Sequence, residues 1–184
     1  MTDNNLDALH NEMVDLNAKI KALQEQAAKT SQEVFKASLA KFFDNIPEIK
    51  MIFWRQYTPY FNDGDACEFS VGDVNFYTEE DRDSDEEDGW DAFNPFMAPS
   101  DYVYREAANE GNRYRDSYQT QIDAYNERVS GVGAERAAQI HRAIEDVKNM
   151  FREIDDDYFL MMFGDHVEVT ATRNGFQVDE FDHD

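Results

Sequence analysis

Residues 51–71, MIFWRQYTPYFNDGDACEFSV, decide the fold. They begin with aromatic and β-branched residues, which are typical of a strand. Pro59 cannot donate a hydrogen bond to a neighbouring strand, so we expect pairing to end near it. The NDGD segment at 62–65 predicts a turn, because Asn and Asp bond to their own backbone and Gly64 accepts a positive φ. We therefore predict that residues 51–71 form a central hairpin with its aromatic side chains in the core.

The two strands of this hairpin are followed by a further strand pattern. Residues 50–57, 67–71 and 74–77 carry these patterns, with a bulge or turn at 72–73. Near the C-terminus, residues 167–172 and 176–181 alternate around Asn-Gly, the strongest short hairpin signal. Two hairpins can merge into an antiparallel sheet of about four strands, covered on one face by helices. The predicted fold class is α+β.

Helical patterns occupy most of the remaining chain. One helix is predicted over 5–44, ending before Pro47. Two more are predicted over roughly 101–129 and 134–158, separated by a loop at 130–133. Gly164 is a plausible C-cap for the apolar run that precedes it. The expected buried positions of the 101–129 helix are Tyr104, Ala107, Ala108, Tyr114, Tyr118, Ile122 and Tyr125.

The first helix carries an apolar stripe at heptad spacing, which is typical of a coiled coil. Its members are Leu6, Leu9, Met13, Leu16, Ile20, Leu23 and Ala27. We expect residues 1–32 to form a coiled-coil-like arm that makes a homodimer, with the first six as self-association residues, and 33–184 to form the α+β domain. The alternative is an amphipathic helix lying on its own domain. The flanking charges are mixed and by themselves do not fix a partner or an orientation. They are Asp7, Glu12, Asp15, Lys19, Lys21 and Glu25.

The composition restricts the classes of partner. The chain has 184 residues and a net charge of −23. Charge of that sign repels nucleic acid and anionic membranes and attracts basic surfaces. Cys67 is the only cysteine, so no internal disulfide is possible, and no stretch approaches 18 apolar residues. We expect a cytoplasmic protein, in a bacterial host cell if it is phage-encoded, without direct nucleic-acid or membrane binding.

An acidic run begins the predicted insert at 79–100. Residues 79–91, EEDRDSDEEDGWD, hold nine acidic side chains and one Arg. An EF-hand loop starting at Asp81 would need Gly and Glu where Glu86 and Ala92 stand, so the calcium-binding register fails. We expect a solvated segment that contacts a basic partner. The predicted contact residues are Glu79, Glu80, Asp81, Asp83, Asp85, Glu86, Glu87 and Asp88.

A metal-dependent enzyme is the main alternative function. The turn carboxylates Asp63 and Asp65, with Glu68, could bind a metal together with residues near the C-terminus. Those residues are Asp165, His166, Asp182 and His183. The chain has no HExxH or CxxC motif, and Asp63 and Asp65 suit an Asx turn better than a metal site. We predict no cofactor. Cys67 has acidic neighbours in Asp65 and Glu68 and no basic one, so a thiol buried in a strand is favoured over a nucleophile.

The segment WRQYTPYFNDGDACEFSV at 54–71 resembles a pattern in small acidic proteins of phages and bacteria. The C-terminal segments FGDHVEV at 163–169 and EFDHD at 180–184 are similar in character. The resemblance covers about a fifth of the chain and implies a phage-related origin, but no activity.

Together these features predict a non-enzymatic acidic interaction protein. Its expected partner is a basic, nucleic-acid-acting or defence protein of the host, which the chain would bind as a DNA mimic or inhibitor. A folded acidic surface can imitate DNA, which displays one negative charge per about 1.7 Å of helix axis. The alternatives are the metal-dependent enzyme and a structural or scaffolding protein of a phage particle.

Overall fold

The computed structural model describes residues 3–61, 64, 66–81 and 94–182, with side chains from His10 onward. Over these residues it is an α+β fold in which one long helix and a five-stranded antiparallel sheet share a core. The predicted fold class is confirmed.

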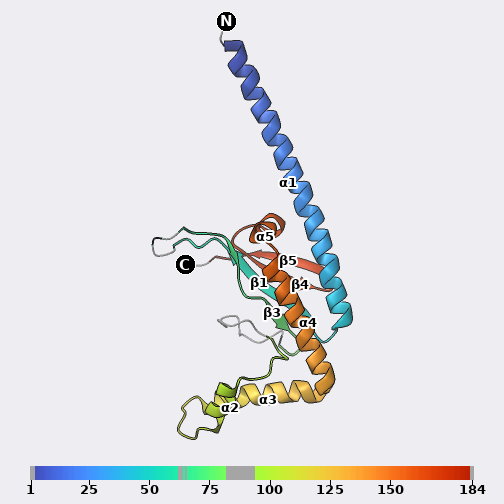
Figure 1. Cartoon of the computed structure of the whole chain (residues 1–184), viewed down its shortest axis with the longest axis vertical. Coiled ribbons are helices and arrows are strands. Elements are labelled where there is room, and N and C mark those ends of the chain that lie inside the picture. The colour runs from blue at the N-terminus through green and yellow to red at the C-terminus, as the bar shows by residue number, and fades with distance from the viewer. Residues whose placement is uncertain (1–2, 62–63, 65, 82–93, 183–184) are drawn as a thin grey trace.

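Helix α1 (Asp3–Asn45) is continuous and crosses the predicted boundary at residue 32 without a break. Figure 1 shows its first part standing clear of the rest of the molecule and its second part lying along the sheet. In this second part the buried side chains recur on one face, which is the helix's contribution to the core. They are Phe35, Leu39, Phe42 and Phe43.

The sheet is built around β1 (Met51–Tyr57). Two short strands, β2 (Ser70–Val71) and β3 (Asn75–Tyr77), pair with one edge of β1. On its other edge β1 pairs with β4 (Val167–Thr172), which forms a hairpin with β5 (Gly175–Glu180). The two predicted hairpins therefore do join into one sheet, although the second strand of the first hairpin is reduced to two short pieces.

The helices after the acidic run are more broken than the sequence predicts. The predicted helix 101–129 divides into α2 (Asp101–Ala108) and α3 (Arg115–Val132). The break forms because Asn109 Oδ1 accepts from the N–H of Gly111 at 3.1 Å and Asn112 Oδ1 accepts from that of Tyr114 at 2.9 Å. These side-chain bonds compete with the helical ladder.

The break between the two predicted helices also differs in position from the prediction. The predicted loop 130–133 is wrong, because α3 continues to Val132 and only Gly133, at φ 88°, separates it from α4 (Ala134–Glu153). The predicted helix 134–158 ends at Glu153, and Asp155 caps a further helix, α5 (Asp156–Phe163). Gly164 is the C-cap of α5, as predicted.

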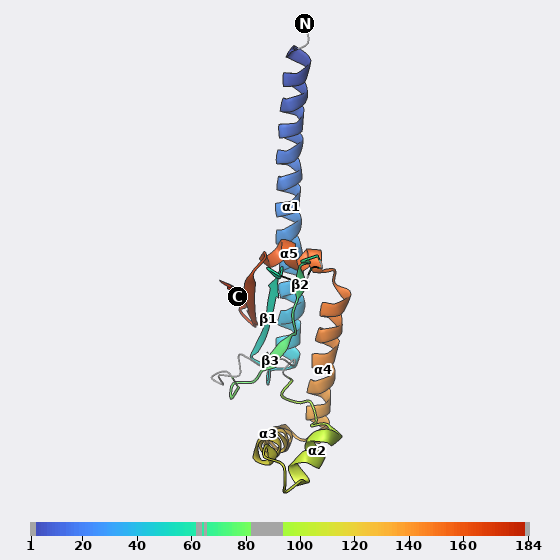
Figure 2. The ribbon, with the colours of Figure 1, turned by 90° about the vertical axis from the view of Figure 1, so that its left-hand side faces the viewer.

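Helices α2 and α3 lie at the end of the molecule opposite the N-terminus (Figures 1 and 2). Of their seven expected buried positions, only Ala107 and Ile122 are buried, whereas Tyr104 and Tyr114 are exposed. Because this helix pair packs mainly on itself, away from the sheet, it has little core to cover. Tyr102 and Tyr118 make an edge-to-face contact between its two helices at 5.8 Å.

The core is largely aromatic and fills the space between the sheet and helices α1, α4 and α5. Phe35 of α1 makes edge contacts with Trp54 of β1, at a centroid distance of 6.2 Å, and with Phe151 of α4 at 5.4 Å. Trp54 is fully buried. By contrast Tyr60 and Phe61 are exposed, so the prediction that all aromatics of 51–71 lie in the core is wrong. They follow Pro59, where the chain has already left the sheet.

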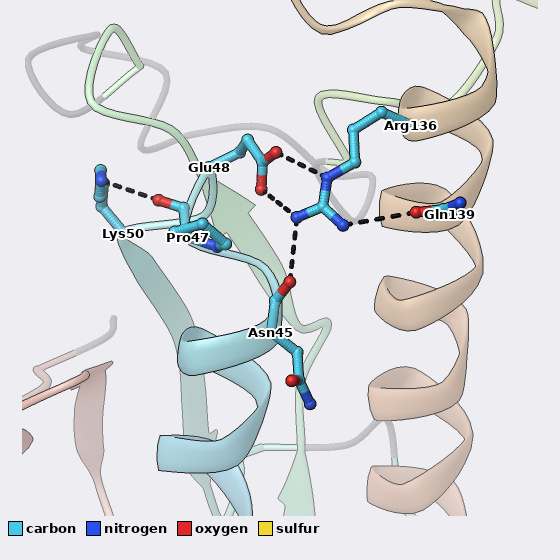
Figure 3. A network of polar contacts seen from close by, with 6 residues as sticks. All are labelled: Asn45, Pro47, Glu48, Lys50, Arg136 and Gln139. Atoms are coloured by element: carbon cyan, nitrogen blue, oxygen red, sulfur yellow. Dashed lines mark hydrogen bonds and ion pairs between the residues drawn. The ribbon is translucent and has the colours of Figure 1, made fainter.

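An ion pair ties the end of α1 to the start of α4 (Figure 3). The guanidinium of Arg136 donates to both carboxylate oxygens of Glu48, at 2.7 and 2.8 Å, and to the carbonyl oxygen of Asn45 at 2.9 Å. The hydrogen bonds from Arg136 hold the pKa of Glu48 below its usual value, although partial burial opposes the shift. This bidentate contact links the connection between α1 and β1 to the first turn of α4.

Candidate interaction site

The free part of α1 carries an apolar stripe, and no other described residue of the chain covers it. From His10 to Ala27 every residue is exposed. Met13, Leu16, Ile20 and Leu23 lie on the stripe with exposed fractions between 44% and 66%. Leu6 and Leu9 belong to the same pattern, but their side chains lie outside the described residues. The alternative prediction, a helix lying on its own domain, does not hold for the arm.

The stripe does not continue into the core face of α1. At 100° per residue, the direction of Met13, Leu16, Ile20 and Leu23 lies about a quarter of a turn from that of the buried face around Phe35. Val34 continues the stripe by a heptad step and is 63% exposed, although the helix has already reached the body there. The stripe is therefore a second, separate apolar surface on the same helix.

The acidic run is only partly described. Glu79 and Glu80 are exposed. Asp81 is 6% exposed, and its carboxylate accepts hydrogen bonds from Thr78 and forms an ion pair with Arg128 of α3. Asp81 therefore anchors the start of the acidic run to α3, and its carboxylate is buried where the sequence predicts a solvated one. Asp83, Asp85, Glu86, Glu87 and Asp88 lie outside the described residues.

Asn94, which follows the acidic run in the sequence, is anchored to the body as well. Asn94 is buried, and its amide nitrogen lies 3.2 Å from Nδ1 of His141 and 3.4 Å from a carboxylate oxygen of Glu145. Since the amide nitrogen can only donate, Nδ1 of His141 is the acceptor. Asp81 and Asn94 are thus attached to helices of the body, α3 and α4 respectively.

The predicted metal site is not assembled by the described residues. Asp63, Asp65 and His183 lie outside them, and Glu68 and Asp182 are exposed. Across the described part of the chain, no three His, Cys, Asp or Glu side chains group as metal ligands.

Asp165 instead has a structural role at the end of β1. Its carboxylate accepts from the backbone N–H and the hydroxyl of Thr58, both at 2.8 Å, and from the N–H of His166 at 2.8 Å. Burial raises the pKa of Asp165, but these hydrogen bonds outweigh it and hold the pKa below its usual value. The ring of His166 stacks on Tyr60 at 4.8 Å.

Cys67 is exposed, contrary to the predicted buried strand thiol. The strand pairing of this segment begins only at Ser70, so residue 67 lies in the connection before β2. A thiol in that position is accessible to reagents.

A pocket of about 450 Å³ lies between the β2–β3 connection and helices α4 and α5. The sequence does not predict this pocket, because its walls come from segments far apart along the chain. Its polar lining residues are Asp73, Lys148, Arg152 and Asp156. Lys148 is buried on the apolar stripe of α4 and pairs with Glu145 at 3.5 Å. The one feature of the sequence that points to this pocket is the position of Lys148 on an otherwise apolar helix face. Opposite charges line the pocket.

Comparisons of the chain with models of known families, with curated proteins and with solved structures give no significant match. Within the described residues of the chain, no helix combines the length and apolar character needed to cross a bilayer.

Proposed function

We propose that the chain is a non-enzymatic interaction protein that self-associates through α1 and offers an acidic body to a basic partner. The exposed stripe on the free part of α1 carries this proposal. Fully burying an apolar side chain of this size contributes about 1.5–3 kcal/mol. Four such side chains at heptad spacing, on a helix that stands clear of the body, favour pairing with another helix.

The charge distribution supports the second half of the proposal. Residues 1–30 hold five acidic and three basic side chains, so 21 of the net 23 negative charges belong to residues 31–184. A body of that charge attracts basic surfaces over several ångströms and accelerates association with them. The partner we propose is a basic nucleic-acid-acting or defence protein of a host cell, bound by a phage-related DNA mimic.

Static light scattering at micromolar concentration tests self-association. We expect a dimer mass for the wild type and a monomer mass for Leu16→Ser combined with Ile20→Ser. Val14→Ser is the matched control, because Val14 is equally exposed on the same helix but lies off the stripe. A monomeric wild type would contradict self-association. A mass well above a dimer would favour the scaffolding alternative.

Affinity capture from host cells, eluted with increasing salt, tests the acidic body. Ionic screening shortens to about 3 Å at about 1 M salt, so a partner held by opposite charge should be released well below that concentration. The released protein should bind DNA and should lose that DNA to the chain in competition. Partners that remain bound at about 1 M salt would contradict a DNA mimic.

A further inference from the structure

We infer that the occupant of the stripe is a second copy of the chain running antiparallel, with Glu12 opposite Lys19 of the second copy. This inference rests on the proposed self-association and adds its orientation and register. In the heptad, Met13, Ile20 and Ala27 occupy a positions, and Leu16 and Leu23 occupy d positions. Glu12 and Lys19 then fall at g, the position directly beside the seam.

The relative orientation of the two helices follows from which residue of the second copy lies opposite each g residue. In a parallel pair, g faces e of the other helix, so Glu12 meets Asn17 and Lys19 meets Gln24, with no charge pair. In an antiparallel pair, g faces g, and Glu12 meets Lys19. Twofold symmetry repeats that contact, so one orientation gains two opposite-charge pairs and the other gains none.

The same charges select the register. With Met13 opposite Leu16 of the second copy, Glu12 lies opposite Lys19. Sliding one helix by a heptad in one direction places Lys19 against Lys19, and in the other direction it places Glu12 against Glu12. Both shifts replace attraction by repulsion, so only one antiparallel register is complementary in both apolar seam and charge.

This register also fits the length of the free helix. It brings residue 3 of the second copy level with residue 26, before α1 joins the body. The junction is marked by Gln32, whose side-chain amide donates to the carbonyl oxygen of Met162 at 3.2 Å. The overlap therefore uses the free part of α1 and stops short of the body.

Repulsion between the bodies favours the same orientation. A parallel pair places two bodies, each with 21 net negative charges, side by side. In the antiparallel register the points where the helices enter the bodies are about 50 Å apart, from a rise of 1.5 Å per residue. That separation is about six times the screening length of about 8 Å at physiological salt.

Charge exchange at g tests the pairing. Glu12→Lys and Lys19→Glu should each weaken the dimer by about tenfold, because each turns both pairs into like charges. An equimolar mixture of the two variants should regain wild-type affinity as a heterodimer. Glu25→Lys and Lys21→Glu are the matched controls, since they make the same charge changes on exposed positions away from the seam and should alter affinity less than about twofold.

A distance measurement tests the orientation on the same samples. With Cys67→Ser, a spin label at Lys29→Cys should give an inter-label distance of about 45 Å if antiparallel and about 20 Å if parallel. A dimer with the short distance, or with no response to the charge exchanges, overturns this inference and leaves self-association standing. A wild-type monomer by light scattering overturns the proposed self-association itself.

Discussion

Gln56 is a fully buried polar side chain near the C-terminal end of β1. Its carbonyl oxygen accepts from the indole N–H of Trp54 at 3.1 Å. Its amide donates to the carbonyl oxygens of Phe159 at 3.1 Å and Gly164 at 2.6 Å. One residue of β1 thereby holds both the core tryptophan and the end of α5.

Replacing Gln56 with Leu should destabilise the fold by about 2–4 kcal/mol, because three buried polar groups lose their partner. Urea unfolding measures the change. Gln177→Leu is the control, since Gln177 is exposed on β5, and it should stay within about 0.5 kcal/mol of wild type. Equal effects from both substitutions would contradict the role given to Gln56.

The pair Arg136–Glu48 gives a pH-dependent test. Because the pKa of Glu48 is lowered in the folded state, its stabilising effect is present above the unfolded pKa and is lost as the pH falls through the folded one. Glu48→Gln should cost about 1 kcal/mol at pH 7, since both side chains are partly exposed. The difference between wild type and variant should shrink below about pH 4. A difference that is constant from pH 7 to about pH 3 would contradict an ionic contribution.

At the scale of elements, neighbouring glycines have opposite roles. Gly131 lies inside α3 with nothing near its Cβ position, so Gly131→Ala should stabilise by about 0.5–1 kcal/mol. Gly133 has φ 88° and ψ 147°, so Gly133→Ala should destabilise by about 1–3 kcal/mol. Thermal unfolding of the two variants checks the sign. The same sign for both would mean that α3 does not extend as described.

Long periodic elements could be predicted from the sequence, and contacts between distant segments could not. Helix α1 and the β4–β5 hairpin follow from a heptad stripe and an Asn-Gly turn. The break between α2 and α3 was missed because Asn109 and Asn112 bond locally to the backbone inside an otherwise helical pattern. The sequence does not distinguish Asp81 from the solvated carboxylates around it. Its partner Arg128 is 47 residues away and is brought beside it only by folding.

For the whole molecule, the large net negative charge lowers the stability of the folded state. A net charge of −23 repels itself in the folded state, and salt relieves that repulsion. Raising sodium chloride from about 20 mM to about 300 mM should therefore raise the thermal midpoint by several degrees. A midpoint that falls would mean that screened ion pairs such as Arg136–Glu48 outweigh the overall repulsion.

Because α1 is continuous, the angle between its apolar stripe and its core face depends on the number of residues between them. The helix runs unbroken from Asp3 to Asn45, so the apolar stripe and the core face are fixed at one angle about a common axis. Inserting one residue between them would turn the body by about 100° and move it about 1.5 Å along the axis. Inserting seven would nearly restore the angle while lengthening the arm by about 10 Å. The length of the helix therefore sets the distance between the two bodies of a dimer, and its helical repeat sets their relative rotation. A partner that contacts both bodies at once would be sensitive to both.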